Sequence, residues 1–444
     1  MLDTFEIIKV KNNKVNSVSF ALVIPYGAKD EPPAKIGITH LVEHMCFRRS
    51  DRLSQTQLYD ALESLGVFIR GTTGKNYLKF SFTCRKKVFS QVIKIFSEML
   101  FFTSYTSEDI EKEKKIVFSE INERYCSTFE SIPEGLWDNP SFSNPILGTK
   151  ETVASITTDE LVKYKRALIK CGGLIIISGN FSQEDFQRTV DIFKNRNITV
   201  IDSDLSEDIF TVSLQNRKND VNLIKEELAS YDRSSYSRNS ELIRSVTKPD
   251  ERFTFVKTCD EICEVIYSMH TKLEHKIVKS KIMLQMLESI LFQGYTSCVG
   301  EVLREEYGLV YGVESYVEII ENEICLVFMV KAPADEIENV ITMIDTILQS
   351  PDIRQRHLRY IKAFYCDNSE MIYDNPEHVC THIASNYINL QQAITPNEYA
   401  KIIEGFSCDE YRELFSAFYS RRNIFIAGKV KRKIINNIKR SLSF

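Results

Sequence analysis

Two histidines and a glutamate near the start of the chain carry the clearest chemistry in this sequence. His40 and His44 are four residues apart in an expected helix, so their rings project from one face about a turn apart, as two ligands of one metal ion must. Glu43 stands beside His44, where a carboxylate can take a proton from a water that zinc activates for attack on a carbonyl. The H-x-x-E-H arrangement predicts zinc-assisted hydrolysis with Glu43 as the general base.

A catalytic zinc needs a third protein ligand, and an acidic helix downstream offers three candidates. This helix, expected to begin near Ser107, carries Glu113, Glu120 and Glu123. Glu113 and Glu120 are seven residues apart, so they lie two turns apart on nearly the same face, and Glu123 is close to that face. The spacing alone leaves all three acids open.

At this point the chain resembles the pitrilysin family, which includes insulin-degrading enzyme and the mitochondrial processing peptidase. His44 and Glu120 are separated by 76 positions, about the distance at which that family carries its glutamate ligand. The resemblance therefore implies that Glu120 is the third ligand of one zinc ion per chain. It also implies that Glu113, which matches a further acid of the family, supports the site without binding the metal.

Several other stretches resemble the family and extend the resemblance over nearly the whole chain. They are Gly37, Leu65-Gly66, Pro145-Ile-Leu-Gly148, Ile177-Ser-Gly179 and, in the second half, Leu303-Arg304-Glu-Glu-Tyr-Gly308-Leu309-Val-Tyr311. The last stretch is similar to an R-x-x-x-G-L-x-Y signature. By that resemblance Arg304 holds a substrate carbonyl and Tyr311 donates a hydrogen bond to the developing oxyanion, both from the second domain.

Residues 67–73 are expected to form an edge strand that receives an extended peptide by backbone hydrogen bonds. Relatives usually carry Asn-Ala-x-Thr there, whereas this chain has Arg70, Gly71, Thr72 and Thr73. We expect these four residues to bind the substrate, and Arg70 to favour acidic or polar peptide side chains.

The order of expected elements indicates an internal duplication. A strand, two helices, two strands and a helix occupy about 15–102, and the same order recurs over about 262–349. Capping boxes open a late helix in each half, at Thr157 with Glu160 and at Ser407 with Glu410. We therefore predict an α+β fold of two homologous domains, each a mostly antiparallel sheet flanked by helices. The resemblance identifies this as the processing-peptidase, LuxS-like metallopeptidase fold.

The predicted domains are a zinc-binding peptidase domain over 1–214, a linker over 215–250 and a homologous domain over 251–444. The linker is rich in Asn, Ser and charged residues with little apolar periodicity. The second domain is expected to lack a metal site, because Gln285 to Ser289 fall where His40 to His44 stand in the first.

Composition limits the class of protein and its location. The 444 residues include 43% hydrophobic and 26% charged residues, which are globular values, and the net charge of −5 disfavours nucleic-acid binding. Eleven cysteines without a C-x-x-C pair indicate reduced thiols, and no apolar stretch reaches a membrane span, so a cytoplasmic location is expected. Lys9, Lys11 and Lys14 precede an apolar run in the manner of a signal peptide, but the run, 18–24, is interpreted as a core strand.

The leading hypothesis is a zinc endopeptidase that cleaves unfolded or short peptides, including precursor or leader peptides. Members of the smaller, two-domain branch of the family pair two subunits, so a homodimer or a heterodimer with a sister subunit is expected. The alternative is a non-catalytic scaffold subunit on the same fold.

Overall fold

The computed structural model describes residues 5–124, 137–194, 198–203, 212–213, 252–273, 278–419 and 421–442, which form two compact units. The first unit comprises Met1–Cys126, Pro140–Tyr236 and Ser369–Glu398. The second comprises Ser127–Asn139, Ser237–Asn368 and Tyr399–Phe444. The linker predicted at 215–250 lies outside the described residues.

The first unit is built on a six-stranded sheet with the order β3-β4-β2-β5-β1-β6. Neighbours from β3 to β5 are antiparallel, and β1 pairs in parallel with both β5 and β6. The short strand β3 lies at one edge, so one side of its backbone has no neighbouring strand in the described sheet. The bounds are β1 Phe5–Lys11, β2 Ser17–Ile24, β3 Arg70–Thr73, β4 Leu78–Arg85, β5 Gly173–Gly179 and β6 Ile198–Ser203.

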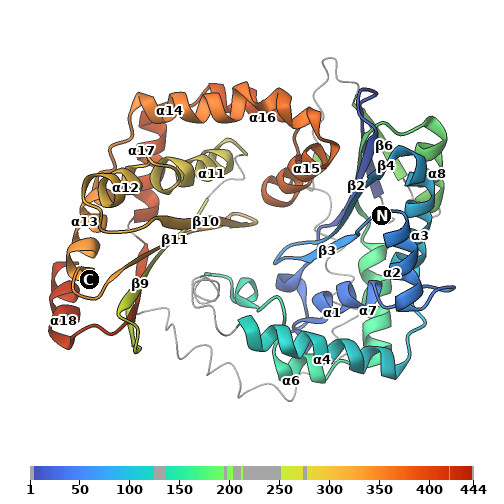
Figure 1. Ribbon diagram of the computed structural model, residues 1–444, viewed down its shortest axis with the longest axis horizontal. Coiled ribbons are helices and arrows are strands. Elements are labelled where there is room, and N and C mark those ends of the chain that lie inside the picture. The colour runs from blue at the N-terminus through green and yellow to red at the C-terminus, as the bar shows by residue number, and fades with distance from the viewer. Residues whose placement is uncertain are drawn as a thin grey trace. The chain divides into compact units, whose positions relative to one another are not determined.

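Helices cover both faces of this sheet (Figure 1). On one face, α1 (Ile38–Cys46), α3 (Phe89–Phe101) and α7 (Thr158–Lys170) pack through apolar side chains against residues such as Phe20 and Phe80. On the other face, α15 (Pro376–Leu390) packs against Ala21, Val23 and Ile176. A segment late in the chain thus completes the core of the first unit.

The second unit contains a five-stranded sheet with the order β10-β11-β9-β13-β8. Its pairs are antiparallel except for β13 and β8, which are parallel. The bounds are β8 Phe253–Lys257, β9 Ile262–Lys272, β10 Val313–Ile320, β11 Glu323–Pro333 and β13 Arg422–Gly428. This order and these directions repeat β3-β4-β2-β5-β1 of the first sheet strand by strand.

The predicted α+β fold with two homologous domains is confirmed by this repetition and by the structural neighbours described below. Both predicted capping boxes form, with Thr157 and Glu160 at α7 and Ser407 and Glu410 at α17 exchanging side-chain and backbone hydrogen bonds. The parallel strands β1 and β8 escaped the sequence analysis.

The remaining helices and strands complete the two units. The further α-helices are α2 Gln55–Ser64, α4 Ser107–Arg124, α6 Lys150–Ala154, α8 Gln183–Phe193, α11 Val278–Phe292, α12 Cys298–Gly300, α13 Ile337–Gln349, α14 Gln355–Lys362, α16 Pro396–Glu404, α17 Cys408–Tyr419 and α18 Arg432–Ser441. Single helical turns of 3-10 or π type lie at η1 Ala28–Asp30, η2 Pro33–Lys35, η3 Lys86–Val88, η5 Pro140–Ser143, η8 Glu301–Glu306, η9 Ala363–Asp367 and η10 Ser369–Asp374, and a two-residue pair joins β7 Val212–Ser213 to β12 Gln392–Ala393. Over the described residues, every helix is too short or too polar to cross a membrane.

Candidate metal centre

A buried carboxylate fixes the start of the helix that carries the two histidines. Glu31 accepts hydrogen bonds from the backbone N–H groups of Gly37, at 2.6 Å, and Thr39, at 2.8 Å, at the first turn of α1. Burial raises the pKa of Glu31 to about 7, although the hydrogen bonds from Thr39 and Gly37 oppose the shift. A carboxylate here satisfies free amides and complements the positive end of the helix dipole.

The start of α1 is a close contact between two glycines from different segments, Gly37 at its N-cap and Gly148 before α6. Gly37 has φ 93° and Gly148 has φ 73°, both in the left-handed region. A Cβ on Gly37 would lie 2.8 Å from the Cα of Gly148, and one on Gly148 would lie 2.3 Å from the carbonyl oxygen of Ile36. Two of the stretches on which the family resemblance rests therefore contact each other at the N-terminus of α1.

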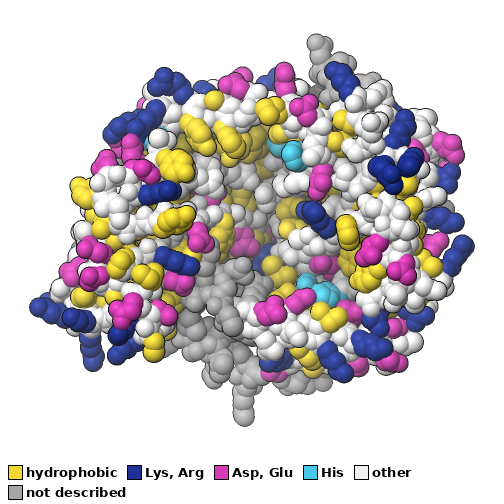
Figure 2. All heavy atoms as spheres, viewed as in Figure 1, with side chains coloured by type: hydrophobic (Ala, Val, Ile, Leu, Met, Phe, Trp, Pro, Cys, Tyr) yellow, Lys and Arg dark blue, Asp and Glu magenta, His cyan; other side chains and the backbone are white. Residues whose placement is uncertain are grey.

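The structure brings together the two histidines and one of the three candidate glutamates. Glu120 on α4 lies beside α1, with 3.5 Å between its Oε2 and Nε2 of His40 and 3.5 Å between its Oε1 and Nε2 of His44. One ligand atom from each residue falls within a cluster no wider than 4.8 Å. Histidine and acidic side chains gather on the visible surface over α1 and α4 (Figure 2).

This donor set fits zinc. Tetrahedral coordination at about 2.0–2.1 Å from each ligand atom separates neighbouring donors by about 3.4 Å. The nitrogen–oxygen separations of 3.5 Å agree with that value. Two imidazoles and one carboxylate are also a typical catalytic zinc set, which leaves a coordination position for water or substrate. Glu123, on the same helix, is exposed and outside the cluster.

Glu113 occupies the position expected of a supporting residue. Its Oε2 lies 3.3 Å from Nδ1 of His44, and its Oε1 lies 3.4 Å from a guanidinium nitrogen of Arg48. Burial opposes protonation of His44, but the carboxylates of Glu113 and Glu120 outweigh it and raise the pKa of the imidazole. A carboxylate on the outer ring nitrogen fixes the tautomer that presents Nε2 to a metal.

Glu43 lies between α1 and the edge strand β3. The Thr73 hydroxyl donates a hydrogen bond to Oε2 of Glu43. A Cβ on Gly71 would stand 2.6 Å from both Cγ and Oε1 of Glu43, so the glycine leaves the space that the glutamate side chain fills. Burial raises the pKa of Glu43, while the hydrogen bond from Thr73 opposes the rise. Gly71 stands where the Asn-Ala-x-Thr pattern has Ala, and the absence of a Cβ there makes room for Glu43.

The sequence predicts zinc-assisted hydrolysis of peptides, and on that prediction replacing Thr73 by Val is expected to slow cleavage by about tenfold while zinc content stays at wild-type level. The substitution keeps the side-chain shape but removes a hydrogen bond to a charged group, which is worth about 1.5–3 kcal/mol. Steady-state cleavage rates and elemental analysis of the purified variant measure the two quantities. The half-buried strand residue Thr254, replaced by Val, is the matched control. A Thr73→Val rate equal to wild type would show that the hydroxyl does not hold Glu43 in its working position.

The four predicted substrate-binding residues divide between the two faces of β3. Gly71 and Thr73 pair with Phe80 and Leu78 and face α1, whereas Arg70 and Thr72 pair with Ser81 and Lys79 and face α15. Arg70 also lies 3.5 Å from Oε1 of Glu377, a residue of α15. Arg70 therefore has a carboxylate partner that the sequence analysis did not foresee.

Arg304 and Tyr311 lie close together in the second unit. Gly308, at φ 63°, ends the turn η8, and the N–H of Leu309 bonds to the carbonyl of Leu303. The chain thereby folds back, with the Arg304 guanidinium 5.7 Å from the Tyr311 ring centre and 4.8 Å from that of Tyr295. Tyr311 is 92% exposed. The glycine of the signature thus brings its Arg and Tyr together, and their entry into the metal site stays a prediction.

The helix of the second unit that corresponds to α1 uses its polar side chains structurally. On α11, Gln285 accepts a hydrogen bond from the Tyr399 hydroxyl, and Glu288 accepts from Ser315. Within the described residues, three-residue groups of possible metal ligands occur only at His40, His44 and Glu120 and at Asp138, His270 and Glu323.

The second group is better explained as an ion-pair network. His270 lies 3.4 Å from Glu323, but Lys272 lies 3.7 Å from Glu323 and Arg421 lies 3.5 Å from Asp138. Burial lowers the pKa of His270, against the pull of Asp138 and Glu323. Because cations already compensate both carboxylates, we assign no metal to this group.

Three residues that shape the candidate centre escaped the sequence analysis. Glu31 caps α1 from outside the helix, Arg48 holds Glu113, and Glu377 reaches Arg70 from a distant part of the chain. Only Arg48 is close in sequence to the motif, since it lies four residues after His44 in the turn that follows α1.

Sequence comparisons with known proteins match part of the chain. Residues 7–150 match the family model described as Insulinase (Peptidase family M16). The chain is 26% identical over 186 residues to the uncharacterized zinc protease YmxG of Bacillus subtilis, covering 40% of this chain and 44% of that protein. It is 22% identical over 158 residues to the mitochondrial-processing peptidase subunit beta of Rattus norvegicus, covering 35% and 32%. The matches span less than half the length of these relatives.

Solved structures are similar over almost the whole chain. A protease from Helicobacter pylori matches with a TM-score of 0.73 at 14% identity, over 95% of this chain and 96% of that one. A peptidase M16 inactive domain from Pseudomonas fluorescens matches with a TM-score of 0.72 at 12% identity, over 96% of each chain. At these identities the likeness establishes the fold. The predicted resemblance to the insulin-degrading enzyme and processing-peptidase family is confirmed.

Proposed function

We propose that this M16-like chain is a zinc endopeptidase that hydrolyses extended peptides at the site formed by His40, His44 and Glu120. The convergence of these three side chains, with Glu43 beside them on α1, is the observation that carries the proposal. The names of the sequence relatives, zinc protease and processing peptidase, support the reaction class.

The roles of the chain's own groups follow from their positions. When bound to His40, His44 and Glu120, zinc supplies Lewis-acid chemistry that makes water a competent nucleophile near neutral pH. The Thr73 hydroxyl donates a hydrogen bond to Oε2 of Glu43. Oε1 is therefore the oxygen that takes the proton of the attacking water. The same carboxyl then returns the proton to the amine nitrogen as the carbon–nitrogen bond breaks.

The substrate is proposed to be an unfolded or short peptide that pairs with the free edge of β3. An edge strand supplies backbone donors and acceptors to any extended chain, whatever its side chains. Arg304 is proposed to hold a substrate carbonyl and Tyr311 to donate to the oxyanion. A donor of this kind is typically worth about 3–4 kcal/mol in the transition state. Processing of a precursor or leader peptide is the biological role that the relatives' names suggest.

We further propose that the chain works as a dimer of itself or with a sister subunit, in the cytoplasm. The relative named as a subunit of the mitochondrial-processing peptidase supports pairing. The second candidate function is a non-catalytic subunit on the same fold, and the similarity to a peptidase M16 inactive domain favours it. The intact ligands and Glu43 favour the enzyme.

Removal and return of the metal test the proposed function. Cleavage of an unstructured peptide library is expected to stop after chelation and to return when one equivalent of zinc per chain is added, because one three-ligand site is proposed. Mass spectrometry of the products and metal analysis of each sample give the two readouts. Zinc binding without zinc-dependent cleavage, alone and with any sister subunit, would favour the non-catalytic candidate.

A further inference from the structure

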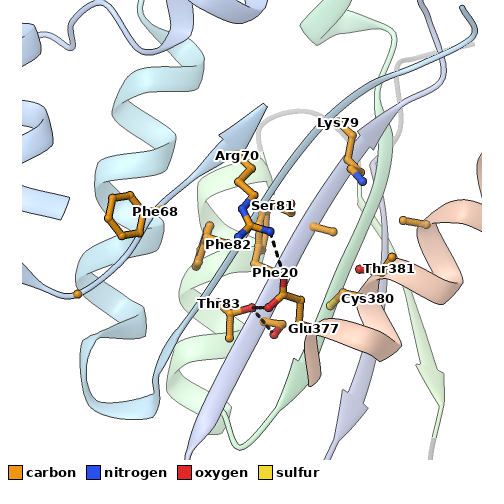
Figure 3. A pocket seen from close by; sticks show the side chains of 14 residues that line it. Phe20, Phe68, Arg70, Lys79, Ser81, Phe82, Thr83, Glu377, Cys380 and Thr381 are labelled. Carbon is orange, nitrogen blue, oxygen red and sulfur yellow. Dashed lines mark hydrogen bonds and ion pairs between the residues drawn. The ribbon is translucent and has the colours of Figure 1, made fainter. Parts of the chain in front are cut away.

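A polar cavity of about 150 Å³ opens on the face of the first sheet that lies opposite α1, the helix of His40 and His44. Strands β2, β3 and β4 and helix α15 all contribute to its lining. Its charged side chains are Arg70 from β3, Lys79 from β4 and Glu377 from α15, which sum to one net positive charge (Figure 3). A positive cavity beside the edge strand is suited to an anionic group of a bound peptide.

The two cations of the cavity differ in how they are compensated. Arg70 lies 3.5 Å from Oε1 of Glu377, whose Oε2 accepts a hydrogen bond from the hydroxyl of Thr83 at 3.4 Å. Among the described residues, no carboxylate lies within ion-pair distance of Lys79 Nζ. Burial, followed by the nearby charge of Arg70, lowers the pKa of Lys79. Lys79 is therefore the cation that would gain most from an incoming carboxylate.

The register of the strands shows which peptide side chain can reach this cation. Lys79 stands opposite Thr72 across the β3–β4 pair, and Ser81 stands opposite Arg70. In-register side chains on one face of a sheet form a row across successive strands. A peptide paired with the free edge of β3 would extend the row of Lys79 and Thr72 by one residue. Only the short side chain of Thr72 would then stand between that residue and Lys79 in the row.

The two faces of β3 separate recognition from chemistry. Gly71 and Thr73 face Glu43 and α1, whereas Arg70 lines the cavity and Thr72 lies on the same face of β3 as Arg70. Successive side chains of an extended peptide point to opposite faces. A residue that enters the cavity is thus a direct sequence neighbour of residues that face the metal helix.

We propose that Lys79, with Arg70, forms a subsite for an acidic side chain of the peptide held on β3, and that Glu377 competes with the peptide for Arg70. The subsite deepens the proposed peptidase function and rests on it, because it assumes that an extended peptide pairs with β3. The substrate class is accordingly an unfolded peptide with Asp or Glu on the side that faces α15.

Paired peptides that differ only by Glu or Gln at one position test this subsite. Each position is scanned in turn with wild type, Lys79→Met and Glu377→Gln. We expect one peptide position at which wild type prefers Glu. At that position Lys79→Met should lower the Glu-to-Gln ratio of kcat/KM about 5–10-fold, and Glu377→Gln should raise this ratio. Methionine retains most of the lysine stem, so packing in the cavity is preserved. Lys94→Met, at an exposed position of α3, is the matched control.

Binding to the Glu43→Gln variant separates the subsite from the proposed catalysis. Fluorescence anisotropy with the same peptides is expected to give the same Glu preference and the same dependence on Lys79 when no bond is cleaved. A preference in binding without any cleavage by wild type would support the subsite and contradict the peptidase. If peptides are cleaved or bound but Lys79→Met changes the Glu-to-Gln ratio at no position, the proposed subsite is wrong. That result would not contradict the proposed peptidase function.

Discussion

Replacing Glu43 by Gln is expected to lower peptide cleavage by about 10²–10⁴-fold while the chain still binds one zinc ion. General-base catalysis typically contributes about 10²–10⁴-fold, and the amide cannot take the proton of the attacking water. Glutamine nearly matches the glutamate in size and retains an oxygen that can accept the hydrogen bond of Thr73. The three proposed zinc ligands are untouched, so metal content separates loss of the base from loss of the site.

Cleavage rates and zinc stoichiometry are measured on protein purified from the same host, so that contaminating peptidases contribute equally. Glu123→Gln, at an exposed position of α4, is the control for a change of one carboxylate to an amide. Equal cleavage by wild type and Glu43→Gln would contradict Glu43 as the general base.

Replacing Glu120 by Gln is expected to abolish stoichiometric zinc binding and, with it, peptide cleavage. Removing a residue that only hydrogen-bonds a metal ligand typically lowers metal affinity about 10–100-fold. Because Glu120→Gln removes a proposed direct ligand, its loss of zinc affinity should be larger. Glu113→Gln supplies that outer-partner comparison, since Glu113 contacts the far nitrogen of His44. Competition against a chelating dye measures the three affinities.

Glu123→Gln decides between the acids that spacing alone left open. Glu120 lies 3.5 Å from both histidines, while Glu123 is exposed on the same helix, so Glu123→Gln should bind zinc as wild type does. The reverse result, with Glu123→Gln losing zinc and Glu120→Gln retaining it, would mean that α4 lies against α1 in a different register.

The three residues of the candidate metal cluster could be chosen from the sequence, because their signals are local or depend on chain separation. The i, i+4 spacing of His40 and His44 fixes their common face in any helix. The choice of Glu120 needed the separation characteristic of the family, because Glu113 and Glu123 satisfied the helical geometry nearly as well. The structure places Glu120 in the cluster and Glu113 behind His44.

Strand β1 was missed because its lysines interrupt the apolar pattern, and only the run 18–24 after them was interpreted as a strand. Its residues Lys9 and Lys11 place their ammonium groups over the rings of Phe186 and Phe181, at 5.2 and 4.6 Å. Long lysine stems can cover apolar surface while the charge stays near water, so a strand with lysines at alternate positions still packs in a sheet.

The contacts of Glu31 and Glu377 were not predictable, because each depends on tertiary packing. Glu31 reaches α1 from a loop six residues before Gly37, and Glu377 comes from a helix more than 300 residues after Arg70. No periodicity in the sequence connects α15 with the first sheet. The sequence predicted a preference for acidic or polar side chains from Arg70 alone. The structure adds Glu377 as a competitor for Arg70 and Lys79 as a second cation of the cavity.

Anomalous diffraction at the zinc edge, from crystals grown with one equivalent of zinc per chain, tests the central proposal most directly. One strong peak is expected within about 2.0–2.2 Å of Nε2 of His40, Nε2 of His44 and a carboxylate oxygen of Glu120. A peak at Asp138, His270 and Glu323 instead, or no peak at the histidines of α1, would contradict it.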